Sequence, residues 1–96
     1  MKKAAFVIKA DGSIVDLPLR KPTLEELQAA VGGYIELLWC MWLGQPAMMF
    51  LDEEGKLKHK ETNYKATHIA HTSGIAANDR VVGDVVLLVG RDVWPD

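Results

Sequence analysis

The chain lacks the features that would support a secreted or membrane-bound protein. Cys40 is its single thiol, so no internal disulfide can form, and a reducing cytoplasm is the expected compartment. No apolar run reaches the roughly 18 residues that a membrane span requires. The stretch after Met1-Lys2-Lys3 is also too short for a signal peptide. These absences predict a soluble, cytoplasmic protein that has no membrane partner.

The chain also has no excess of positive charge. Its 11 lysines and arginines stand against 13 acidic residues, which gives a net charge of −2 and a pI near 5.9. Non-specific nucleic-acid binders usually carry a basic face, so nucleic acid is not an expected partner. One local stretch departs from this balance and holds Lys56, Lys58, His59, Lys60 and Lys65. Such a stretch either meets an anionic ligand or forms a solvated hairpin and loop.

Catalytic signatures are missing as well. Gly32-Gly33 has neither the spacing nor the lysine of a phosphate-binding P-loop. Cys40 has no positive neighbours that would lower the pKa of its thiol, so we assign it to core packing. His68 and His71 are one helical turn apart, but no third ligand stands at a recognisable spacing. We therefore expect no metal, no cofactor and no enzymatic activity.

Apolar residues make up 49% of the 96 residues and charged residues 25%, which is typical of one globular domain, here residues 1–96. The patterning predicts an α+β fold of order ββαββαβ, in which a mainly antiparallel sheet carries one or two helices on one face. The expected strands are 4–9, 13–17, 34–43, 47–52 and 80–90, with a turn at 44–46 and brief pairing at 56–58. The expected helices are 23–31 and 64–72.

Turn and capping residues set the limits of these elements. Asp11-Gly12 provides the positive φ of a tight hairpin turn. Thr23 and Glu26 form the pattern of a capping box at the start of the first helix, and Gly32-Gly33 ends it. Asn63 is placed to cap the second helix. The run at 81–89 is apolar on both faces, as a central strand would be.

The run from Val31 to Leu43 is apolar on nearly both faces of the expected strand. One face holds Ile35, Leu37, Trp39, Met41 and Leu43. We assign this face, with Trp39, to the core. The other face holds Tyr34, Glu36, Leu38, Cys40 and Trp42. A chain this short has little material left to cover the second face, so Leu38, Cys40 and Trp42 are predicted interface residues. A homo-oligomer, most simply a two-fold dimer, is the expected assembly.

A set of polar and aromatic residues forms the predicted ligand site. An indole can stack on a nucleobase, and lysines can meet phosphates. The members of this set are Tyr34, Glu36, Trp42, Lys56, Lys58, Asn63, His68, His71 and Thr72. Structural alternatives remain open for some of these residues. Trp42 is then buried within the monomer, Glu36 pairs with Lys56 or Arg80, and the histidines lie on a polar helix face.

Several motifs occur together in a fixed order. They are Leu24-x-x-Leu27-Gln28-x-x-Val31-Gly-Gly-Tyr-Ile-Glu36, Asp52-Glu-Glu-Gly-Lys-Leu57, Asn63-x-x-Ala66-Thr67, and Val82-Gly-Asp-Val85 with Gly90. This set resembles a family of small domains of unknown function spread through bacteriophages, prophages and plasmids. The family usually has Asn where this chain has Asp52. The resemblance implies a mobile-element context and not a reaction.

Two functions are consistent with these observations. The first is a non-catalytic accessory protein of a phage or mobile element that sequesters a small anionic ligand of the nucleotide type, such as a host immune signal. Acting in the host cytoplasm, such a protein would serve anti-defence. The second is an inhibitor or adaptor that binds a host or phage protein through an apolar strand face.

Overall fold

The structure, a computed structural model, describes residues 2–96. Its elements are β1 (Ala4–Ile8), β2 (Ile14–Asp16), α1 (Leu24–Val31), β3 (Ile35–Trp42), β4 (Gln45–Asp52), α2 (Tyr64–Ala70), the short 3-10 turn η1 (His71–Ser73), β5 (Val85–Val89) and a second 3-10 turn, η2 (Arg91–Val93). The predicted α+β class and ββαββαβ order are confirmed. The single-domain prediction also includes Met1, which lies outside the described residues.

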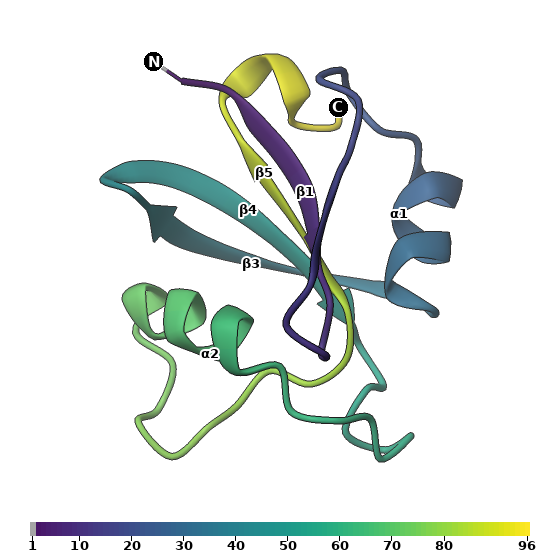
Figure 1. The fold of residues 1–96 in the computed structure, drawn as a ribbon, viewed down its shortest axis with the longest axis vertical. Coiled ribbons are helices and arrows are strands. Elements are labelled where there is room, and N and C mark those ends of the chain that lie inside the picture. The colour runs from purple at the N-terminus through teal and green to yellow at the C-terminus, as the bar shows by residue number, and fades with distance from the viewer. Residues whose placement is uncertain (1) are drawn as a thin grey trace.

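The five strands form one antiparallel sheet in the order β2-β1-β5-β4-β3 (Figure 1). All five residues of β5 are buried, which confirms the prediction of a central strand. The strand is shorter than the predicted 80–90 because Gly83 has a φ of +75° and the chain turns there. A Cβ at Gly83 would lie 2.7 Å from Cδ of Lys60, so only glycine fits this close approach.

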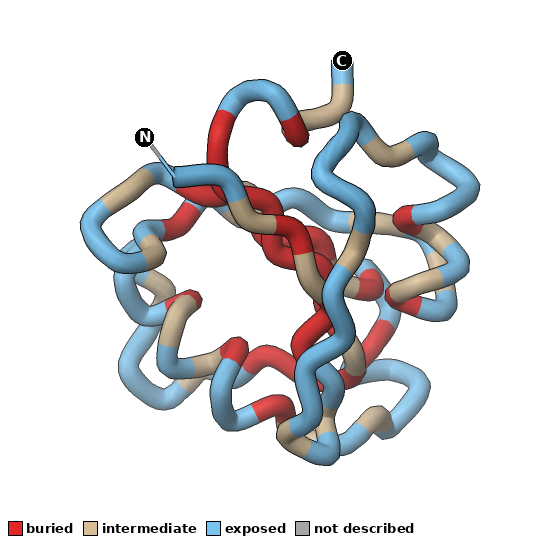
Figure 2. Tube along the Cα trace, turned by 45° about the horizontal axis from the view of Figure 1, so that its top comes forward, coloured by how far each residue is buried: buried red, intermediate tan, exposed pale blue. Residues whose placement is uncertain are grey.

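The helices lie on opposite faces of the sheet, which corrects the expectation of helices on one face. Leu27 and Val31 of α1 belong to a buried cluster with Phe50, Val86 and Leu88. The α2 face forms a second buried cluster, in which Ala66 and Ala70 join Met49, Val85 and Leu87. Because β5 is apolar on both sides, each side needs a covering layer. Figure 2 shows the buried segments concentrated in the strands between the two helices.

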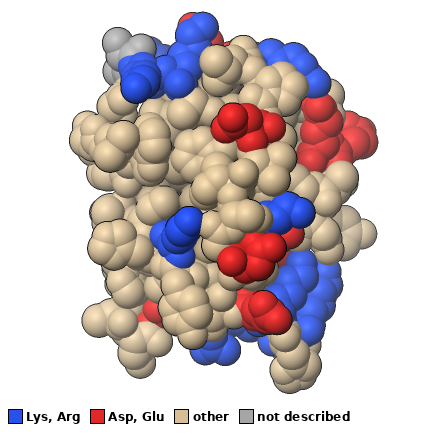
Figure 3. Space-filling model, viewed as in Figure 1, with Lys and Arg blue, Asp and Glu red and all other residues tan. Residues whose placement is uncertain are grey.

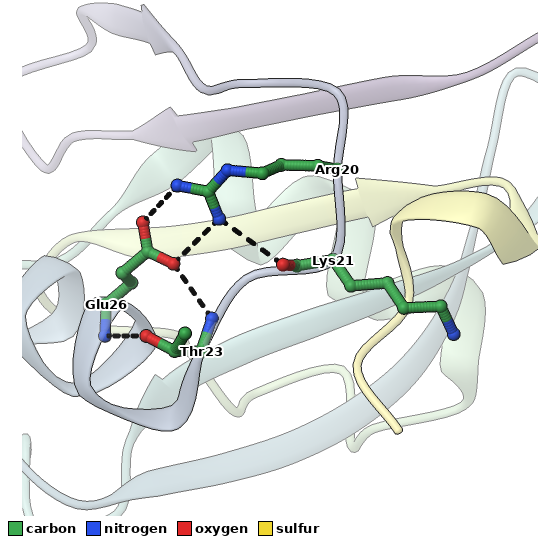
Figure 4. A network of polar contacts seen from close by, with 4 residues as sticks. All are labelled: Arg20, Lys21, Thr23 and Glu26. Atoms are coloured by element: carbon green, nitrogen blue, oxygen red, sulfur yellow. Dashed lines mark hydrogen bonds and ion pairs between the residues drawn. The ribbon is translucent and has the colours of Figure 1, made fainter.

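Helix α1 begins with the predicted capping box (Figure 4). Oγ1 of Thr23 accepts a hydrogen bond from the Glu26 N–H at 3.1 Å, and the Glu26 carboxylate accepts one from the Thr23 N–H at 2.9 Å. Both terminal nitrogens of Arg20 donate hydrogen bonds to the same carboxylate, at 2.9 and 2.7 Å. The hydrogen bond from Arg20 is the main reason that the pKa of Glu26 falls to about 2.

The end of α1 is fixed by a buried carboxylate. Asp52 is 4% exposed and lies 2.8 Å from Nζ of Lys58 and 2.7 Å from Nζ of Lys60. Lys60 also donates to the C=O of Val31 at 2.7 Å, which satisfies a carbonyl that the helix end leaves free. A Cβ at Gly33 would lie 2.6 Å from Oδ1 of Asp52, so glycine is required there.

Burial alone would raise the pKa of Asp52. The hydrogen bonds from Lys58 and Lys60, with one from the Glu54 N–H, outweigh burial and lower this pKa to about 2. Asp52 is therefore a structural anchor between the end of α1, the end of β4 and the loop that follows. This role suits a carboxylate, because it holds two ammonium groups at once.

Two predictions around β4 are wrong. The β3–β4 turn is Leu43-Gly44, with φ values of +48° and +77°, and not residues 44–46. A two-residue turn with two positive φ values matches the twist of a hairpin, so Gln45 and Pro46 are free to begin β4. The brief pairing predicted at 56–58 is absent from the described chain, because these residues lie in consecutive turns.

Candidate functional site

The Cys40 face of β3 is covered within the monomer by α2 and η1. Cys40 is 5% exposed, its Sγ lies 3.7 Å from the Ala47 C=O, and burial raises the pKa of its thiol to about 11. The assignment of Cys40 to packing is confirmed. Leu38 and Trp42 are half-buried in the same cluster. The reasoning that nothing in the chain could cover this face was therefore wrong, because the short helix α2 suffices.

The opposite face of β3 is the bare one. Leu37 is 43% exposed, Trp39 48% and Met41 41%. Helix α1 lies over β4 and β5 and leaves much of β3 uncovered. The prediction that Trp39 belongs to the core is wrong: its main aromatic contact is Trp94, in an edge-to-face arrangement with ring centroids 5.0 Å apart.

A groove of about 680 Å³ lies on the α2 side of the sheet. It runs between α2 and the β1–β2 hairpin, where the short helix leaves the outer strands uncovered. Its lining residues are Phe6, Ile8, Ile14, Asp16, Trp42, Tyr64, Lys65, His68 and Ile69. The rings of Phe6 and Trp42 pack at 5.6 Å between centroids and make an aromatic wall. Lys65 donates to the Gly12 C=O at 2.6 Å and joins the start of α2 to the hairpin turn.

Polar groups stand around this apolar groove. Asp16, Tyr64, Lys65 and His68 are all exposed and line it. Within residues 2–96 the imidazole of His68 forms no hydrogen bond, and Lys65 keeps donors beyond the one that it gives to Gly12. The arrangement can hold a flat apolar group against the aromatic wall and offer a cation to an anionic substituent.

The predicted ligand residues do not form one site. Trp42 and His68 meet in the groove. Glu36 and Lys56 line a separate cleft of about 190 Å³, together with Arg80. Tyr34 and Lys58 line a third hollow beside the end of α1. The sequence gives no spacing rule that would separate these three places, because they depend on how β3 and the 53–60 segment pack.

The other three predicted ligand residues make contacts within the fold. Asn63 is 1% exposed; its amide donates to the C=O of Ile8 and of Gly83, both at 2.9 Å, and accepts from the Ala66 N–H at 3.0 Å. It is the predicted cap of α2 and uses its whole amide there. The ring of His71 lies 3.3 Å from the Asp79 C=O, and Oγ1 of Thr72 accepts from the Met41 N–H at 2.9 Å.

The four lysines of the basic stretch do not gather into one patch. Lys56 pairs with Asp79, Lys58 and Lys60 pair with Asp52, and Lys65 binds the hairpin turn. In Figure 3 the face in view carries scattered charges of both signs on a largely uncharged surface, and its largest blue area adjoins red atoms. Of this stretch, Lys65 alone lines the groove.

Sequence reasoning missed most of the groove's lining. Phe6, Ile8 and Ile14 belong to the predicted hairpin, and their place opposite α2 follows from the sheet order. A signal existed in α2, where Tyr64 and His68 are one turn apart on a helix of only seven residues. A helix this short cannot cover a whole face of a five-stranded sheet.

Across residues 2–96, no three His, Cys, Asp or Glu side chains come together in a way that could hold a metal ion. No helix in the same residues has the length and apolar character to cross a membrane.

Comparisons with known proteins give one result. No curated protein and no solved structure matches the chain. One family matches over residues 1–93, nearly the whole length, and its description names no reaction. The chain therefore belongs to the family described as "Domain of unknown function (DUF3846)".

Proposed function

We propose that this protein binds, without chemical turnover, a small ligand that has a planar ring and an anionic group, of the nucleotide type, in the groove beside α2. The observation that carries the proposal is the groove itself, which is lined by the aromatic wall of Phe6 and Trp42 and by the exposed His68. A volume of about 680 Å³ suits a nucleotide-sized molecule.

Stacking supplies the main affinity in this proposal. A base on an aromatic side chain contributes about 1–3 kcal/mol. Trp42 is the largest aromatic residue of the lining, and its half-buried position keeps the indole fixed for stacking. Lys65 and His68 are the groups that would meet phosphate, since both line the groove and are exposed.

The proposed setting is the cytoplasm of a cell that carries a phage or another mobile element. There the protein would sequester a nucleotide-type immune signal and so act in anti-defence. The support is the resemblance of the Gly-Tyr-Ile-Glu36 and Glu-Glu-Gly-Lys56 motifs to domains found in such elements, together with the single reduced thiol of Cys40.

A fluorescence titration tests ligand binding. Adenosine monophosphate should quench tryptophan emission, adenosine should do so more weakly, and inorganic phosphate alone should have little effect. Trp42→Leu should abolish the response, whereas Trp39→Leu, on the opposite face of the sheet, should preserve it. An unchanged response in a folded Trp42→Leu variant would remove the groove from the proposal.

The absence of turnover has its own test. After incubation and heat denaturation, adenosine monophosphate should be recovered unchanged by chromatography. A cleaved product that disappears with His68→Ala or with Glu36→Gln would establish an enzyme instead.

A further inference from the structure

Strand β3 is an open edge of the sheet, and its hairpin fixes which backbone groups point outward. The two-residue turn makes Trp42 and Gln45 a hydrogen-bonded pair. Because such pairs alternate, the even-numbered residues of β3 bond to β4 and the odd-numbered ones point away from it. Two observations agree: the Glu53 N–H donates inward to the Tyr34 C=O at 2.9 Å, and the Met41 N–H donates outward to Thr72 at 2.9 Å.

Thr72 closes the edge only at Met41. Within residues 2–96, no group bonds the outward N–H or C=O of Leu37 or Trp39. The open part of the edge is therefore Ile35–Trp39, called the β3 edge below. A row of donors and acceptors at strand spacing is satisfied by another extended strand. The β3 edge also carries the bare apolar side chains of Leu37 and Trp39.

We propose that a second copy of this chain pairs with the β3 edge, antiparallel and about a two-fold axis through Leu37. The two Leu37 residues then exchange N–H···O=C bonds, with their Cα atoms about 5.5 Å apart. Ile35 of each copy lies opposite Trp39 of the other. The two sheets become one, and the bare face of β3 continues across the axis.

The sequence of the β3 edge is complementary to itself in this register. Its single charge is Glu36, which falls opposite Leu38 of the second copy and not opposite the other Glu36. The register also leaves both Met41–Thr72 contacts intact, because Met41 lies beyond the paired segment. The edge lacks the lysine, proline or bulge by which monomeric proteins discourage such pairing. The groove lies on the other face of the sheet, so this inference does not depend on the proposed ligand.

Cysteine cross-linking tests the register. Under mild oxidation with glutathione disulfide, most of a Leu37→Cys variant should become a disulfide-linked dimer, because its thiols meet at the axis. Met41→Cys, equally exposed on the same face, should stay largely uncross-linked. Ile35→Cys and Trp39→Cys should each fail alone and should cross-link when mixed. The wild-type protein, whose single thiol is the buried Cys40, is the control and should form no cross-link.

Sedimentation completes the test with the unmodified chain. Wild type should show reversible dimers as its concentration approaches millimolar, and Leu37→Lys should be a folded monomer, since a charge then stands at the axis. Equal cross-linking of the Leu37→Cys and Met41→Cys variants would overturn the register. Wild type that stays monomeric throughout would overturn the pairing of copies and leave the β3 edge to a different protein.

Discussion

The two faces of strand β3 are similar in sequence and opposite in environment. One face places Leu38, Cys40 and Trp42 against α2, and the other leaves Leu37 and Trp39 bare. Both faces hold a tryptophan and aliphatic side chains, so hydrophobicity cannot tell them apart. The difference arises from the two helices: α2 and η1 contact β3 closely, whereas α1 lies mainly over β4 and β5.

This comparison shows that a covering layer decides the role of an apolar face. Where a short helix covers only part of a sheet face, a groove remains beside the helix, and here that groove lies next to Trp42. A bare apolar face at the edge of a sheet is available for contact with another protein, and this is the surface that we propose for the β3 edge.

Charge placed on the two faces should have unequal effects on stability. Trp42→Glu should lower the free energy of unfolding by about 3 kcal/mol, because it removes buried ring contacts and buries a carboxylate. Trp39→Glu should cost only about 1 kcal/mol, the value of its aromatic pair with Trp94. Urea unfolding of dilute protein measures both. Equal losses would mean that the faces are equally buried.

Asp52 lies opposite Ile35, at the end of the bare face, and its ion pairs should make the stability of the protein depend on acidic pH. Its pKa in the folded protein, about 2, lies below the ordinary value of 3.8, so the ionised carboxylate stabilises the fold above pH 4 or so. This contribution, about 2 kcal/mol, is lost as the pH falls toward the folded pKa. Asp52→Asn should remove it at neutral pH and weaken the acid dependence of stability.

A matched control separates this anchor from surface charge. Asp92 pairs with Lys3 at 3.2 Å but is 73% exposed in its side chain, so Asp92→Asn should leave stability nearly unchanged. Glu26, whose pKa is also about 2, keeps part of the acid dependence in the Asp52→Asn variant. If both variants lost stability equally, the buried geometry of Asp52 would have no special effect.

The smallest expected effect is at Thr72, which connects η1 to the open edge of β3. Thr72→Val should cost about 1 kcal/mol by removing the hydrogen bond from the Met41 N–H. It should also speed hydrogen exchange at Met41. Ser73→Ala is the control, because the Ser73 hydroxyl donates to the Ala70 C=O, at 2.7 Å, and not to a backbone group of β3. Equal exchange at Met41 in the two variants would show that Thr72 does not close the edge.

Local signals in the sequence predicted the elements well. The capping box of Thr23 and Glu26, the cap at Asn63 and the hairpin at Asp11-Gly12 depend on residues close in the chain. The central position of β5 followed from its apolar character on both faces. These features need no knowledge of which helix covers which face.

The site was harder to predict because it depends on long-range packing. Alternation along β3 separated its residues into the correct two sets, but it could not say which set α2 would cover. The prediction that Trp39 belongs to the core is therefore wrong, and Trp42 is partly buried, which is the alternative that the sequence left open. The lysines looked like a patch in sequence, yet turns after β4 direct Lys58 and Lys60 to Asp52 and leave Lys65 on α2.

Fluorine NMR of protein that contains fluorotryptophan tests the central claim most directly, because Trp39, Trp42 and Trp94 report separately. Tryptophan-to-phenylalanine variants assign the three resonances. Adenosine monophosphate should shift the Trp42 resonance and leave Trp39 unmoved, whereas dilution should shift Trp39 and leave Trp42 unmoved. A nucleotide that shifts Trp39 alone, or a dilution that shifts Trp42 alone, would contradict the account of one covered face that binds ligand and one bare face that binds protein.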